Sequence, residues 1–368
     1  MKNIIVLCGG KSAESDISLI TENLLLNAID IKKYNVYPIV VDKNNHWFYI
    51  KDFKNNIQNQ NIPKKEVYLK FGEKHLYVKT TFGLKKLVDI DCAILCHHGL
   101  FGEDGTIQGI LEYCNIPYTS SKVLSSSISM DKVVMKLLFK EFGFNVVDYV
   151  YFDKDDYLLN EQKVIDDITK KLDYPLIIKP ANLGSSIGIN VAKNIEELRK
   201  GIETALFFDE KILIEKQIEN FREINCAVLG YKNDYIVSSL EEPVSYKEFL
   251  SFDDKYLFDK KGKQREYPAN IDKKIEIKIK KMSADIFRKF ELSGVVRIDY
   301  IVKDDVVYVN EINSIPGSMA YYLFEKEKLS FSEIIDKLID FGVEKNADKN
   351  LLTYAYKSNV LEKGNIKK

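Results

Sequence analysis

The sequence predicts an α/β protein in which a parallel α/β unit at residues 1–124 precedes two α+β units. Strand-like apolar runs alternate with helical periodicity in the first unit, which is typical of a parallel sheet. The later units, residues 125–216 and 217–345, each combine helices with strands that end in charged side chains. A chain of 368 residues is also too long for one ordinary core, so we expect two or three lobes. The tail at residues 346–368 has no role that the sequence reveals.

The composition is that of a soluble globular protein, with 45% hydrophobic and 30% charged residues. The 54 basic residues balance 55 acidic ones, which gives no reason to expect nucleic acid or an anionic membrane as partner. No apolar run approaches the roughly 18 residues of a transmembrane helix. The first strand begins at residue 3, which leaves no room for a secretory signal peptide. We therefore expect a cytoplasmic protein.

The five cysteines are scattered along the chain. Cys92 and Cys96 stand beside His97 and His98, a grouping that invites a zinc site. However, residues 92–96 form an apolar run, and alternate residues of a strand face opposite ways. We therefore favour buried structural thiols in a reducing compartment.

The first unit begins with a strand at residues 3–8 that ends at a pair of glycines. Apolar residues then recur at helical spacing over residues 17–25, and further strands fit residues 36–41 and 92–96. The insertion at residues 43–80 is typical of short antiparallel strands and loops.

Helix caps and apolar patterns also predict the elements of the second and third units. In the second unit, Ser129 or Asp131 can cap a helix that runs to about residue 142. The remaining expected elements are strands at 175–179, 187–191 and 224–229, a polar aromatic loop at 241–268, and helices at 194–207, 271–290 and 331–342.

A metal site is predicted where Arg297 and Asp299 lie on one apolar run and Glu311 and Asn313 lie on the next. A turn at residues 303–305 would pair the two runs as strands and bring the three oxygen-bearing side chains together. Mg²⁺ prefers one or two carboxylates with substrate phosphates. The alternative is an amphipathic hairpin with solvated acids.

A phosphate-binding loop is predicted after Lys179, which ends an otherwise apolar strand and precedes a loop with Gly184, Ser185 and Gly188. Glycines let backbone N–H groups approach phosphate oxygens, and the lysine supplies a charge. The alternative is a plain turn. The segment lacks the ending of a Walker A motif.

Two weaker signals accompany that loop. Glu215 and Lys216 end a short apolar strand and Glu223 follows, so an acid there would accept hydrogen bonds from adenine or ribose, although surface acids are common. The glycine-rich segment 98–109 marks a strand-to-helix junction, where open α/β sheets bind ligands. Asp104 would cap the helix, and a tight loop without a ligand is the alternative.

Taken together, these motifs resemble the D-alanine–D-alanine ligases of the ATP-grasp superfamily. The resemblance extends from residue 4 to about 340 and includes five separate motifs in the family's order. It implies an ATP-grasp fold with an N-terminal parallel α/β domain and two α+β lobes clasping ATP. It also implies an ATP-dependent ligase acting on D-amino acids for peptidoglycan precursors, with two Mg²⁺ ions (or Mn²⁺) and a homodimer through the N-terminal lobe.

The resemblance also implies roles for individual residues. Arg297 and the Gly317 amide would stabilise the tetrahedral oxyanion, and Glu14 would pair with the first substrate's ammonium group. Lys255 would reach the γ-phosphate from a closing loop, where Tyr256 joins Ser185 and Glu14. The remaining implied roles are ATP phosphate binding by Lys132 and Lys179, nucleoside binding by Glu215, Lys216 and Glu223, metal binding by Asp299, Glu311 and Asn313, and substrate contact by Ser18, His98, Tyr322 and Leu323.

The chain departs from the family at Tyr322, which falls where a serine hydroxyl is expected to receive the second substrate's carboxylate. Sites that hydrogen-bond a substrate discriminate strongly between substrates, so a phenol at this position puts the identity of the second substrate in question. We expect two D-alanines. The alternatives are D-serine, D-lactate or another amino acid, and a non-catalytic ATP-binding paralogue. A nicotinamide-dependent oxidoreductase is disfavoured because Gly9 and Gly10 lack the dinucleotide-binding spacing.

Overall fold

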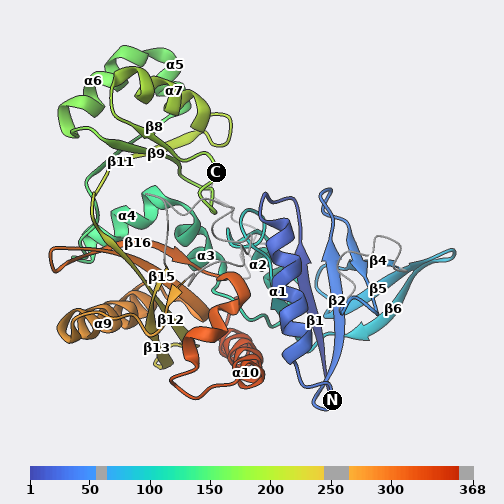
Figure 1. Ribbon diagram of the computed structural model, residues 1–368. Helices are drawn as coiled ribbons and strands as arrows, with labels where there is room; N and C mark the ends of the chain where they lie inside the picture. The colour runs from blue at the N-terminus through green and yellow to red at the C-terminus, as the bar shows by residue number, and fades with distance from the viewer. Residues whose placement is uncertain (55–63, 244–264, 356–368) are drawn as a thin grey trace, which may run out of the picture.

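A computed structural model describes residues 1–54, 64–243 and 265–355 of the protein, which form three lobes built on three separate sheets (Figure 1). The three-lobed α/β architecture predicted from the sequence is confirmed. Tyr256 and Lys255, with most of the polar aromatic loop, lie outside the described residues. Among the described residues, no helix combines the length and the apolar character that crossing a membrane requires.

The N-terminal lobe carries a seven-stranded sheet of mixed direction, in the order β6-β5-β4-β3-β2-β1-β7. Three strands are parallel, as predicted: β1 (Lys2–Gly9), β2 (Tyr34–Val41) and β7 (Cys92–Leu95). Helix α1 (Ser15–Ala28) packs on β1. The rest of the sheet is antiparallel and consists of β3 (Trp47–Tyr49), β4 (Lys65–Leu69), β5 (His75–Thr80) and β6 (Gly83–Asp89).

The insertion contains the short antiparallel strands predicted for it. The first of them, β3, pairs with the free edge of β2 and so extends the parallel sheet. The insertion continues past residue 80 to the end of β6 at Asp89. The cysteines match their prediction, since all five are buried free thiols.

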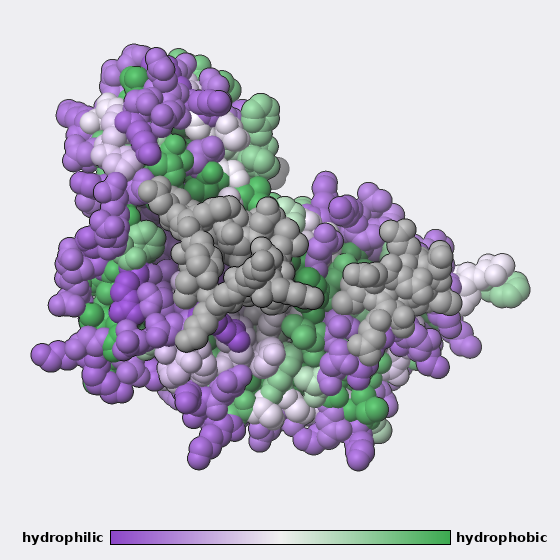
Figure 2. Space-filling model, in the orientation of Figure 1, coloured by the Kyte–Doolittle hydropathy of each residue, from purple (hydrophilic) through white to green (hydrophobic). Residues whose placement is uncertain are grey.

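The middle lobe has a four-stranded antiparallel sheet in the order β10-β9-β11-β8. Its strands are β8 (Tyr149–Asp153), β9 (Leu176–Pro180), β10 (Asn190–Ala192) and β11 (Lys211–Lys216), and its helices are α5 (Lys154–Leu159), α6 (Glu161–Lys171) and α7 (Ile195–Ala205). Of these, β8, α5 and α6 were not predicted. Hydrophilic residues dominate the face of this lobe seen in Figure 2.

Three helices lead from the N-terminal sheet into the middle lobe: α2 (Thr106–Tyr113), α3 (Val123–Met130) and α4 (Lys132–Glu141). The predicted cap of α4 is Asp131, whose carboxylate accepts hydrogen bonds from the backbone N–H groups of Val133 and Val134. That cap satisfies two N–H groups that a helix start leaves without partners. Helix α3, immediately before it, was not predicted.

The C-terminal lobe has a five-stranded sheet in the order β14-β13-β12-β15-β16. The strands are β12 (Arg222–Tyr231), β13 (Asp234–Pro243), β14 (Arg265–Glu266), β15 (Ser293–Lys303) and β16 (Val306–Asn313). The helices are α9 (Lys273–Lys289), the 3-10 segment η1 (Gly317–Phe324) and α10 (Phe331–Asn350).

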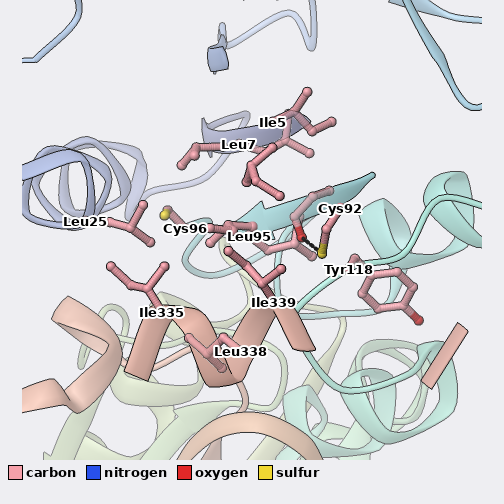
Figure 3. Close-up of a cluster of buried hydrophobic side chains, with 14 of the residues drawn as sticks. Ile5, Leu7, Leu25, Cys92, Leu95, Cys96, Tyr118, Ile335, Leu338 and Ile339 are labelled. Carbon is pink, nitrogen blue, oxygen red and sulfur yellow. Dashed lines mark hydrogen bonds between the residues drawn. The ribbon is translucent and has the colours of Figure 1, made fainter. Parts of the chain in front are cut away.

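Helix α10 connects the C-terminal lobe to the N-terminal one. Ile335 and Ile339 point toward Leu95, the last residue of β7, and toward the adjacent Cys96 (Figure 3). Leu338 belongs to the same hydrophobic core. The helix continues to residue 350, eight residues beyond its predicted end. The last turns of the helix are polar in sequence, although tertiary contacts bury part of them. Their polar composition did not predict a helix.

A glycine marks the junction between β15 and the N-terminal lobe. Gly294 has φ +81°, and a Cβ there would lie 2.0 Å from the carbonyl oxygen of Thr119. Gly72 offers a matched comparison, since it has φ +79° and, in the part of the chain that the structure describes, no atom lies within 4 Å of a Cβ added there.

We expect Gly72→Ala to lower the free energy of unfolding by roughly 1 kcal/mol, the cost of a left-handed alanine. Gly294→Ala adds a steric clash with backbone and should cost about 3 kcal/mol or more. Thermal unfolding followed by circular dichroism measures both variants. Equal losses in the two would show that the contact with Thr119 does not constrain the lobes.

Candidate active site

Two adjoining cavities lie where the three lobes meet. One has a volume of about 610 Å³ and is lined by the middle and C-terminal lobes. The other, of about 560 Å³, is lined by α1 and by the C-terminal sheet. Four polar residues line both cavities: Lys132, Ser185, Glu223 and Glu311. A molecule spanning the two cavities would therefore pass these side chains.

The first cavity contains a buried ionic cluster. The Glu215 carboxylate lies 2.5 Å from the Nζ atoms of both Lys136 and Lys179. Burial alone would raise the pKa of Glu215, but the two lysines outweigh it and lower that pKa to about 2. Of the two lysines, Lys179 lines the cavity, and its ammonium group suits phosphate oxygens.

A further lysine, Lys132, lines both cavities. Its Nζ donates to the carbonyl oxygen of Leu183 at 2.7 Å and lies 3.8 Å from Glu311. Lys216 and Glu223, predicted to bind the nucleoside, line the same cavity. Apart from Lys255, which lies outside the described residues, the lysines and acids predicted for ATP thus lie around one cavity.

The predicted phosphate loop after β9 is strained, and it reaches the N-terminal lobe. Ser185 and Ser186 have φ of 52° and 59°, in the left-handed region that side chains rarely adopt. The Ser185 hydroxyl donates to the Glu14 carboxylate. A Cβ at Gly184 would lie 2.9 Å from that carboxylate, so the glycine permits the close approach. The predicted pairing of Glu14 with Ser185 is present.

Strands β15 and β16 bring the predicted metal ligands together. Asp299 stands opposite Glu311, and Arg297 opposite Asn313. Arg297 donates to both oxygens of Asp299 at 2.7 and 2.8 Å, and the Asn313 amide donates to Asp299 at 3.0 Å. The predicted hairpin and the convergence of its polar side chains are confirmed.

The donor set fits a hard cation. It provides two carboxylates and one amide oxygen, to which substrate phosphates add further oxygens. Within the described ranges, no group of three or more His, Cys, Asp or Glu side chains could hold a metal by itself. Asp299 and Glu311 would therefore bind Mg²⁺ together with phosphate oxygens, while Asn313 completes the set.

The segment that carries Gly317 is anchored to the N-terminal lobe. Gly317 lines the second cavity, and a Cβ there would meet no atom of the described residues within 4 Å. The next residue, Ser318, has φ 52° and donates its N–H to the Thr21 hydroxyl at 3.1 Å. That hydroxyl also lies 2.9 Å from Nε2 of His98.

Three of the predicted substrate residues are absent from the cavity walls formed by the described residues: Ser18, His98 and Leu323. Ser18 accepts a hydrogen bond from the His98 backbone at 3.0 Å. Burial lowers the pKa of His98 to about 4, so its ring is neutral at neutral pH. Leu323 is buried, and its carbonyl oxygen accepts from the Tyr267 hydroxyl at 2.8 Å. In this structure these residues support the wall rather than face the cavity.

The sequence prediction missed other polar residues at the site. Glu103 accepts hydrogen bonds from the backbone N–H groups of Gly99 and Ile315, and burial together with nearby Glu14 raises its pKa to about 8. Lys136 follows Lys132 by one helical turn, a spacing that would have identified it. Further missed residues are Thr21, Glu241 and Arg265, which line the second cavity.

Comparisons with known proteins agree on one family. Family models described as D-ala D-ala ligase N-terminus and C-terminus match residues 3–121 and 138–340. The D-alanine–D-alanine ligase of Thermosipho melanesiensis is 42% identical, with 96% of this chain and 97% of the relative covered.

Two solved structures are similar over most of their length. A D-alanine–D-alanine ligase from Coxiella burnetii has a TM-score of 0.80 at 26% identity, covering 95% of this chain and 96% of that one. The VanG D-Ala:D-Ser ligase from Enterococcus faecalis has a TM-score of 0.79 at 29% identity, covering 93% and 99%.

The buried ionic cluster gives a test of this site. We expect Glu215→Gln to lower the free energy of unfolding by about 3–5 kcal/mol, because it leaves two buried lysines without their carboxylate. The matched control is Asp285→Asn, which breaks the exposed 2.7 Å pair with Arg288 and should cost less than about 1 kcal/mol. Urea unfolding measures both, and similar losses would contradict the role given to the cluster.

Proposed function

This chain belongs to the D-alanine–D-alanine ligase family, and we propose that it joins two D-alanines, with ATP and Mg²⁺, to supply peptidoglycan precursors. The chain is an ATP-dependent ligase with the ATP-grasp fold. The observation that carries the proposal is the meeting of the two cavities at Lys132, Ser185 and Glu311. The cationic side chains of the first cavity, which suit phosphates, thereby adjoin the groups of the second cavity that would stabilise an oxyanion.

The proposed reaction has two steps. A carboxylate oxygen of the first D-alanine attacks the γ-phosphorus of ATP, so that ADP leaves and an acyl phosphate forms. The free amine of the second D-alanine then attacks the acyl carbon. The tetrahedral adduct expels phosphate, the nitrogen loses its proton, and the dipeptide remains.

In this proposal, residues of the first cavity bind phosphates and residues of the second cavity stabilise the oxyanion. Lys132 and Lys179 bind and orient the phosphates, whose crowded anionic oxygens form the main barrier. Arg297 and the Gly317 amide line the second cavity, where oxyanion charge would develop on the adduct. Bound Mg²⁺ would neutralise phosphate charge and draw together the attacking and transferred oxygens.

The first substrate's ammonium group has a suitable anion in Glu14. This carboxylate is 6% exposed and lies in the wall of the second cavity. Because the pKa of nearby Glu103 is raised to about 8, that carboxyl is mostly protonated at neutral pH. The pair then carries about one negative charge, which matches a single ammonium group.

A second candidate function keeps this chemistry and changes the second amino acid to D-serine. Tyr322, which replaces the expected serine, lines the second cavity and donates its hydroxyl to Glu241 at 3.2 Å. The structurally similar VanG protein is a D-Ala:D-Ser ligase. A non-catalytic role is disfavoured, because the predicted phosphate and metal residues are all retained. Cytoplasmic location and a homodimer remain predictions.

Glu311→Gln should lower turnover by about two orders of magnitude or more, because it removes one of two carboxylates from the metal set. Unfolding should change little, since Glu311 is on a solvent-accessible wall. Steady-state ADP release at increasing Mg²⁺ measures the effect. Activity within about twofold of the parent would show that Glu311 is not a metal ligand.

The proposed function itself is tested by product analysis. The purified protein is given ATP, Mg²⁺ and single or paired D- and L-amino acids, and mass spectrometry identifies the products. D-alanine alone should give the dipeptide. If only another pair is joined, the second substrate is not D-alanine, and Tyr322→Ser should then shift that preference without changing the KM for ATP.

A further inference from the structure

A compact polar group surrounds the residue at which this chain departs from its family. The guanidinium carbon of Arg265 lies 3.9 Å from the centre of the Tyr322 ring. Glu241 accepts a hydrogen bond from the Tyr322 hydroxyl at 3.2 Å, and its other oxygen lies 3.8 Å from Arg265. All three residues line the second cavity. The phenol is therefore engaged by Glu241, and its ring supports an arginine.

The other cations of this cavity have partners already. Arg297 donates twice to Asp299, and Lys132 donates to Leu183 and lies near Glu311. The Arg265 side chain is 44% exposed. Among residues 1–54, 64–243 and 265–355, it has only the long contact with Glu241 and the ring contact. As far as those residues are concerned, its planar fork of N–H donors is open to an anion in the cavity.

We propose that Arg265, held over the Tyr322 ring, receives the carboxylate of the second amino acid in place of the expected serine hydroxyl. This inference rests on the proposed function, because it assigns a residue to the acceptor of that reaction. A guanidinium binds a carboxylate through two parallel hydrogen bonds, which fixes orientation as well as affinity.

Glu241 acts here as a positioning residue, because it holds the Tyr322 ring and does not bond directly to Arg265. Glu241 is 4% exposed, and burial raises its pKa, although Arg297 and Arg265 both favour its charged form. The 3.8 Å between Arg265 and Glu241 exceeds a hydrogen-bond length, so this contact does not occupy the N–H donors of Arg265. The bond between Glu241 and Tyr322 fixes the ring over which the guanidinium lies.

The subsite recognises a chemical class rather than one side chain. Every amino acid has the carboxylate, so Arg265 would accept D-alanine and D-serine alike and reject acceptors that lack that group. An uncharged analogue, D-alaninamide, has the same amine and methyl group and no carboxylate. It therefore isolates the proposed contact.

The test is a competition between D-alanine and D-alaninamide as acceptors, with ATP and Mg²⁺ present, and mass spectrometry of the two products. Their ratio reports acceptor preference independently of enzyme amount and of first-substrate binding. The wild type should favour D-alanine strongly. Arg265→Ala should lower the ratio about 10- to 100-fold, and Arg265→Lys should lower it less.

Arg288→Ala, on the exposed surface of α9, is the matched control and should leave the ratio unchanged. A ratio in Arg265→Ala within twofold of the wild type would overturn the proposal. If that variant does not fold, the ratio in Arg265→Lys decides in the same way. Wild-type turnover of D-alanine is measured beforehand and tests the proposed function alone, since it makes no reference to Arg265.

Discussion

The first cavity depends on the buried pairing of Glu215 with two lysines. Lys179 and Glu215 come from neighbouring strands of the middle sheet, whereas Lys136 comes from α4. That helix also packs Met135 and Phe139 into the core of the C-terminal lobe. The ionic cluster thus holds the middle lobe to the C-terminal one across the cavity, because an unpaired buried charge would be costly on either side.

A second junction fixes the N-terminal lobe against the same C-terminal sheet. Gly294 meets Thr119 in close contact, and Ser121 exchanges hydrogen bonds with the backbone of Ser293. Lys345, from the polar end of α10, donates to the carbonyl oxygen of Ser120. These contacts hold α1, and with it Glu14, at the wall of the second cavity. The acid that would bind the first substrate's ammonium is therefore placed by contacts remote from it.

The second cavity, where we propose that the second amino acid binds, has a different arrangement of charged groups from the first cavity. There the chain lacks the serine expected in the family and has an aromatic ring under a guanidinium. Arg265 belongs to β14, which pairs with the end of β13, where Glu241 lies, and Tyr322 belongs to η1. Three elements far apart in the sequence thus form one polar group. The departure from the family is a single residue, Tyr322, but the contacts of its side chain are made with Glu241 and Arg265.

The sequence by itself determined the elements whose signal is local. Strand β9 with its terminal Lys179, the cap at Asp131 and the β15–β16 hairpin with Asp299 and Glu311 all followed from periodicity, turns and spacing. These features depend on residues that are neighbours in the chain, so their side chains meet wherever the strands or helices form.

Only the tertiary structure decided which side chains from separate segments are buried or paired with one another. It buried Lys136 beside Glu215, turned His98 and Leu323 away from the cavities, and brought Arg265 onto Tyr322. It also carried α10 to residue 350, through a polar run that has no helical apolar pattern. The physical reason is the same in each case. Burial and pairing of charged groups are set by partners distant in sequence, and composition or periodicity within one segment does not encode them.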